Sequence, residues 1–144
     1  MATMAGACAG ACMHDDDFGP VTMVSDRDIP GVLRVRVHGR GGDAGAALRR
    51  WRHHITRARE AGLNQLLVIR DLQGPVISEA ELAGMMAQLA KLDLRGLRVA
   101  LVQTRHERHH IDELGTLLAM EHGAGARVFP DEASALLWLR HGAD

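Results

Sequence analysis

Alternation of hydrophobic and polar residues is clearest over positions 33–38, where Leu, Val and Val alternate with Arg, Arg and His. This period of two predicts a β-strand with one buried and one solvent-exposed face. A shorter apolar run, Val21–Ser25, precedes it, and the turn residues of Asp26–Gly31 connect the two. Because the connection is short, we predict that the two strands form an antiparallel hairpin.

Three further apolar runs predict strands. Residues 66–69 (Leu-Leu-Val-Ile) contain no polar residue, which is typical of a central strand covered on both faces. The run Arg98–Gln103 and the short run Ala126–Phe129 predict two more strands, and residues 71–75 are expected to form a loop.

The first of four predicted helices follows a glycine-rich turn at residues 39–42, and Asp43 is its expected N-cap. One apolar face, with arginines opposite, indicates how this helix packs. His53 and His54 fall on the arginine-rich side, where we expect them to be solvated or partly packed. The apolar face consists of Leu48, Trp51, Ile55 and Ala58.

The second predicted helix begins with the sequence of a capping box. Ser78 can accept a hydrogen bond from the backbone N–H of Glu81 while the side chain of that glutamate reaches back. Apolar residues at helical spacing mark this helix and the third one, and the last helix follows Pro130-Asp131. These apolar positions are Leu82, Met85, Met86 and Leu89 in the second helix, and Ile111, Leu114 and Leu118 in the third.

The predicted element order is β-β-α-β-α-β-α-β-α. Alternating strands and helices predict a single α/β domain over residues 20–144, with a mixed sheet that opens with the antiparallel hairpin. Residues 1–19 are rich in Ala, Gly and Met, carry Asp15–Asp17 and show no periodicity, so we predict a flexible N-terminal tail.

Composition disfavours several classes of function. The 144 residues are 47% hydrophobic and 24% charged, with a net charge of −1 and only 3% aromatic residues, so we expect no nucleic-acid partner. No stretch approaches the roughly 18 uninterrupted apolar residues of a membrane span, and no integral membrane association is expected. Cys8 and Cys12 both fall in the predicted tail, which favours a reducing, cytoplasmic location over a disulfide framework.

One histidine-rich segment fits the His-Glu-x-x-His pattern of zinc peptidases, in which two histidines hold the metal and the glutamate acts as a general base. The segment is His106-Glu107-Arg108-His109-His110. The charged pair at its centre, and its position directly after a strand, favour a solvated helix start instead. We therefore predict neither a metal ligand nor a cofactor, and zinc-dependent hydrolysis through His106, Glu107 and His110 is the least favoured function.

A second motif, Gly-x-Gly-x-x-Ala at residues 39–44, resembles a phosphate-binding turn between a strand and a helix. Asp43 would place a carboxylate beside the bound anion, and the preceding strand is half exposed, unlike the buried first strand of a dinucleotide fold. A flexible turn is the favoured interpretation.

Four stretches of the chain resemble the STAS-like fold of bacterial anti-sigma-factor antagonists, especially its SpoIIAA-like group. They are VLRVRVHGR, LLVIRDLQG, RVALV and ARVFPDEASALLWL, and the resemblance covers residues 20–140. It implies a protein-binding switch, because most members of the wider family are switches, although some related folds hold small or lipidic ligands. The family's phosphoswitches carry Asp-Ser-Ser-Gly after the central strand. This chain has Asp71-Leu72-Gln73-Gly74 there, and Ser78 is the nearest serine.

We therefore predict a non-enzymatic regulatory module that binds another protein, with a homodimer as one arrangement. The alternative is a carrier of a small apolar or lipidic ligand, held between the sheet and the helices. Ligands of parallel sheets gather beyond the carboxyl ends of the strands, which places the site in the loops there. The predicted binding residues are Asp71, Leu72, Gln73, Gly74, Ser78, Arg105 and His106.

Overall fold

A six-stranded sheet forms the centre of the fold in a computed structural model that describes residues 12–13 and 18–141. The strands lie in the sheet in their sequence order. The first three pair antiparallel and the last four pair parallel, so the predicted mixed sheet with an antiparallel opening is confirmed. The strands are β1 (Cys12–Met13), β2 (Val21–Asp26), β3 (Val32–Arg40), β4 (Gln65–Gln73), β5 (Arg98–Gln103) and β6 (Gly125–Phe129).

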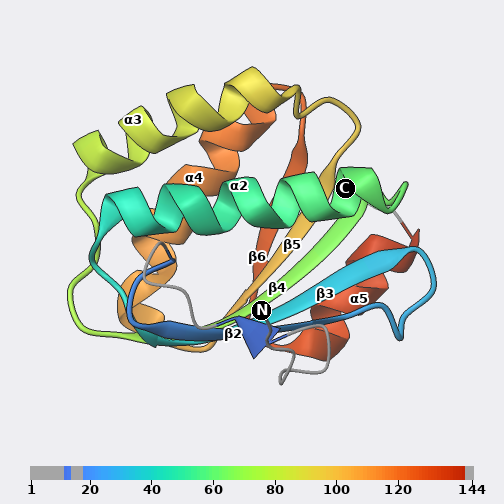
Figure 1. Ribbon diagram of the computed structural model, residues 1–144, viewed down its shortest axis with the longest axis horizontal. Helices are drawn as coiled ribbons and strands as arrows, with labels where there is room; N and C mark the ends of the chain where they lie inside the picture. Colours follow the sequence, from blue (N-terminus) through green and yellow to red (C-terminus); the bar gives the residue numbers. More distant parts are fainter. Residues whose placement is uncertain (1–11, 14–17, 142–144) are drawn as a thin grey trace, which may run out of the picture.

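Three helices cover one face of the sheet and a fourth covers the other (Figure 1). Each of the three connects two neighbouring parallel strands. Such crossovers are right-handed, and each successive parallel strand is added at the same edge of the sheet. All three helices therefore lie on the same face. The three are α2 (Ala44–Glu60), α3 (Glu79–Leu89) and α4 (His109–Glu121), while α5 (Glu132–His141) lies on the opposite face. The described part of the chain also contains two 3-10 turns, η2 (Ala90–Leu92) and η3 (His106–Arg108).

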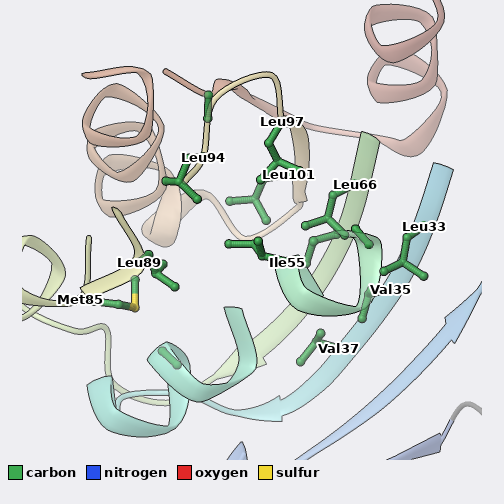
Figure 2. Close-up of a cluster of buried hydrophobic side chains, with 14 of the residues drawn as sticks. Leu33, Val35, Val37, Ile55, Leu66, Met85, Leu89, Leu94, Leu97 and Leu101 are labelled. Carbon is green, nitrogen blue, oxygen red and sulfur yellow. The ribbon is translucent and has the colours of Figure 1, made fainter. Parts of the chain in front are cut away.

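The sheet separates two hydrophobic cores. Side chains of β3, β4, β5, α2 and α3 point into the larger core, including Leu66, Ile55 and Leu89 (Figure 2). On the other face, Leu67 of β4 packs with Phe129 and α5. The side chains of Leu66 and Leu67 are both 0% exposed, which confirms the prediction that this strand is covered on both faces.

Hydrogen bonding extends two strands beyond their predicted ends. Residues 71–73 belong to β4, so the prediction of a loop over 71–75 is wrong for them, and β3 continues through Gly39 and Arg40 into the predicted turn. Both strands extend further because they pair with each other. Arg40 and Gln73 are the last partners of the parallel β3–β4 ladder, in which each strand supplies backbone hydrogen-bonding groups to the other. β1 is a further difference, since it adds two residues of the predicted tail to the sheet. Residues 1–11 and 14–17 of that tail, with Cys8 and Asp15–Asp17, lie outside the described residues.

The polar face of β3 is only partly solvent-exposed. Arg34 donates to Asp26 at 2.9 Å and to Glu132 of α5 at 2.7 Å, and its side chain is 18% exposed. Arg36 and His38, further along the strand, are exposed as predicted.

No helix in the described part of the chain is long and apolar enough to cross a membrane.

Both predicted helix caps are confirmed. Asp43 accepts a hydrogen bond from the backbone N–H of Ala46, and Ser78 and Glu81 form a complete capping box at the start of α3. Replacing Ser78 with alanine should lower the free energy of unfolding by about 1 kcal/mol, because one backbone N–H of α3 loses its acceptor. Urea denaturation measures this change. Ser78→Asp is the matched control. Because aspartate caps a helix equally well, this variant should unfold with a free energy within a few tenths of a kcal/mol of that of the original protein. Equal losses in both variants would contradict the role of the cap.

Candidate functional site

A cavity of about 110 Å³ lies between the sheet and the helices α2, α3 and α4. Apolar side chains form most of its wall, among them Ile55, Met86, Leu89, Leu97 and Leu101. Several wall positions are small, and this explains why the layer of helices leaves space above the sheet. α3 packs against α2 and α4, and the small wall residues beneath and beside it are Ala47, Gly115, Ala119, Ala124 and Ala126.

One end of this cavity is charged. Arg50 of α2, Arg70 of β4, Arg108 of η3 and Asp112 of α4 all line it. Arg50, Arg108 and Asp112 are each only 5% exposed. Buried charges are expensive unless they are paired, so the partners of each group decide what this end of the cavity can bind.

Asp112 is the centre of a buried hydrogen-bond network. Arg70 donates to its Oδ1, and the Nε2 of the fully buried Gln103 donates to its Oδ2 at 3.1 Å. His109 Nε2 lies 2.7 Å from the carbonyl oxygen of Gln103 and ties the start of α4 to the end of β5. This network positions Arg70, yet Arg70 Nε is buried and has no hydrogen-bond partner among the described residues, a property shared only with Arg98 Nε.

Arg50 and Arg108 are bound by backbone carbonyl groups. Arg50 donates to the carbonyl of Phe18 at 2.7 Å, and Arg108 donates to the carbonyls of Gly74 and Pro75 at 2.7 and 3.2 Å. Neither arginine forms an ion pair within the described residues. Burial, reinforced by the positive charge of Arg70, lowers the pKa of Arg50 to about 10, and the same two causes lower the pKa of Arg108. The charged end of the cavity therefore holds three guanidinium groups and one carboxylate.

The predicted binding residues lie at the same end of the sheet but do not form one site. Asp71 pairs with Arg105 at 2.7 Å, and because neighbouring residues of a strand point to opposite faces, this pair lies across the sheet from Arg70 and the cavity. Leu72 is buried and lines the cavity, and Gly74 reaches it only through its carbonyl bond to Arg108. Gln73, Ser78 and His106 are exposed.

The histidine-rich segment is divided between two elements, since His106 and Glu107 lie in η3 while His110 lies in α4. His110 Nε2 lies 3.0 Å from a carboxylate oxygen of Glu79. Within residues 12–13 and 18–141, no group of three or more metal-ligating side chains is close enough together to hold an ion. Arg108, at the centre of the segment, is buried, so this helix start is not the fully solvated one that we predicted.

Sequence reasoning missed Arg50, Arg70 and His54, and a signal for each was present. Arg70 continues the period of two that places Leu66 and Val68 on one face of β4, and so belongs to the buried face. Arg50 and His54 are four residues apart, as are His54 and Ala58, so they share a helical face that is buried. The prediction that the arginines of this helix lie opposite its buried face is wrong for Arg50, and the prediction that His54 is at most partly packed is wrong as well. The predicted apolar face contains only hydrophobic residues, whereas Arg and His can also occupy an inward face.

No protein-family model and no curated protein sequence matches this chain.

Proposed function

We propose that this protein binds a small molecule in the cavity beneath α3, as a carrier or a ligand-dependent regulator. The single observation that carries the proposal is the cavity itself, which has an apolar wall and one charged end. Binding sites for small molecules are typically concave and mostly apolar, with a few polar groups that fix the orientation of the ligand. This corresponds to the second of the functions that the sequence predicted.

The size of the cavity limits the apolar part of the ligand. An engineered apolar cavity of about 150 Å³ binds benzene, and the volume here is about 110 Å³. A single ring or a short acyl chain is therefore the largest apolar group that fits without movement of α3. A long lipid chain would require the helices to separate.

Trp51 provides a direct test, because it lines the cavity while the second tryptophan, Trp138, packs against Phe129 and Arg98 on the other face of the sheet. In a Trp138→Phe background, titration with toluene should change the fluorescence of Trp51 in a saturable way. Toluene is neutral, so this experiment tests the apolar wall alone.

Filling the cavity should abolish this response. Ala119 of α4 lines the cavity, and Ala119→Leu should weaken toluene binding at least tenfold, about 1.4 kcal/mol, without lowering thermal stability, since leucine occupies otherwise empty space. Ala133→Leu is the matched control, because Ala133 is exposed on α5 at the opposite face. An unchanged toluene affinity in Ala119→Leu, or an equal loss in both variants, would contradict the proposal.

The STAS-like relationship is proposed on the element order and on the four sequence stretches that resemble that group. A protein partner, a homodimer, the absence of enzymatic activity and a cytoplasmic location stay predictions. For a protein partner, the surface to test first is α4, where Leu117 and Met120 are 58% and 52% exposed one helical turn apart.

A further inference from the structure

We propose that the ligand of this cavity carries a carboxylate head group, which binds between the guanidinium groups of Arg50, Arg70 and Arg108. This inference rests on the proposed function, because it concerns the charged end of the same cavity. It specifies the chemical class of the ligand as a small amphipathic monocarboxylate.

Charge is the first argument. Three arginines and a single aspartate line this end of the cavity, and that aspartate is already bound by Arg70 and Gln103. Arg50 and Arg108 have only backbone carbonyl groups as hydrogen-bond partners among the described residues. A carbonyl oxygen carries a partial charge and does not neutralise a guanidinium. An anionic ligand would supply the missing countercharge where water is largely excluded and ion pairing is strong.

Unused donors are the second argument. Arg70 Nε is buried and has no partner, although a buried N–H normally has an acceptor. The Nη2 of Arg70 donates to Asp112, and this bond holds the guanidinium at the wall of the cavity. The planar fork of a guanidinium matches the two oxygens of a carboxylate in size and geometry.

The neighbouring acids favour a single negative charge on the ligand. Asp112 lines the cavity, the negative charge of Asp43 acts on Arg50, and that of Glu107 acts on Arg108. A doubly charged group such as a phosphate monoester would be repelled by all three carboxylates. A carboxylate needs less countercharge and less space.

Three probes with the same ring separate the possibilities: phenylacetate, 2-phenylethanol and phenyl phosphate. They are titrated at pH 7 against the full chain carrying Trp138→Phe, with Trp51 fluorescence as the readout. We expect phenylacetate to bind at least tenfold more tightly than 2-phenylethanol and more tightly than phenyl phosphate. In Arg50→Met, this preference should fall to about one while the affinity for 2-phenylethanol stays unchanged.

Arg105→Met is the matched control. Arg105 pairs with Asp71 across the sheet from the cavity, so this variant should keep the full preference for phenylacetate. The three probes are first compared in the Trp138→Phe chain, in which no cavity residue is changed, so the test does not depend on the folding of Arg50→Met. Arg108→Met provides a second variant with the same expected loss.

The outcomes distinguish the two proposals. Equal affinity for the acid and the alcohol would overturn the carboxylate site but leave the apolar cavity as a binding site. Tighter binding of phenyl phosphate would overturn the assignment to a carboxylate and assign the arginines to a phosphate group. Failure of toluene and of all three probes to bind would overturn both proposals.

Discussion

Replacing Asp112 with alanine is expected to lower the free energy of unfolding by about 3–5 kcal/mol, because it leaves the guanidinium of Arg70, whose side chain is only 12% exposed, without its partner. Among the described residues, Asp112 is the only carboxylate lining the charged end of the cavity, and it accepts hydrogen bonds from both Arg70 and Gln103. In the variant, Arg70 would keep Arg50 and Arg108 as charged neighbours on the cavity wall but would lose its carboxylate partner. The amide of Gln103, which is 0% exposed, would lose its acceptor as well.

Thermal and urea unfolding measure this loss, which corresponds to a decrease in melting temperature of roughly 10 °C for a chain of this size. Asp71→Ala is the matched control. Asp71 also pairs with an arginine, Arg105, which follows the end of β5, but the side chain of Asp71 is 59% exposed. Exposed ion pairs contribute about 0–1 kcal/mol, so the control should remain close to the original stability. Similar losses of unfolding free energy in the two variants would show that the burial of Asp112 is not the reason for its contribution to stability.

Acid sensitivity centred on His54 is the second large expected effect. His54 is 3% exposed, and burial lowers its pKa from 6.5 to about 3. The charges of four neighbouring cationic side chains act in the same direction. These side chains belong to His53, Arg50, Arg70 and Arg57.

The sign follows from proton binding. Below pH 6.5 the unfolded chain protonates His54 while the folded chain does not, so stability is complete above pH 6.5 and is lost as the pH falls towards 3. Between pH 6.5 and 4.5 this one group should cost roughly 2 kcal/mol, since each pH unit in that window corresponds to about 1.4 kcal/mol.

His54→Leu should remove this part of the pH dependence, because leucine does not titrate and the surroundings of residue 54 are largely apolar, with Met23, Leu33 and Val35 nearby. The measurement is the free energy of unfolding by urea at several pH values. The difference between His54→Leu and the original protein should grow by roughly 2 kcal/mol in favour of the variant from pH 6.5 to 4.5. His38→Leu, at an exposed position of β3, should show no such change. A constant difference for His54→Leu would contradict a buried, neutral histidine.

The periodicity of the chain predicted most of the fold because each element here obeys the simple rule for its class. Residues 33–38 alternate, residues 66–69 are uniformly apolar, and Ser78 stands three residues before Glu81; each pattern corresponds to the strand or helix start that is observed. The ends of strands were less predictable. Asp71 and Gln73 have polar side chains, yet they remain in β4 because the backbone of β3 pairs with them, and side-chain type does not report on that pairing.

The candidate site was only partly accessible to sequence reasoning. The prediction that a site lies beyond the carboxyl ends of the strands directed attention to Leu72 and Gly74, which lie at the charged end of the cavity. The arginines that line this end, Arg50, Arg70 and Arg108, are not among the predicted binding residues. Their spacing placed Arg50 and Arg70 on inward faces, but the sequence contains no comparable signal for Arg108, which follows an irregular loop in η3.

Local sequence patterns predicted the helices α2–α5, the strands β2–β6 and the order of these elements, because they depend on contacts between residues close along the chain and on which side chains avoid water. The meeting of Arg50, Arg70, Arg108 and Asp112 at one end of one cavity depends instead on how distant segments pack. These four residues come from α2, β4, η3 and α4, and the distances between them depend on how three crossovers pack over the sheet. The cavity also depends on packing, since it results from small residues on several elements that face the same space, a coincidence that no local pattern encodes.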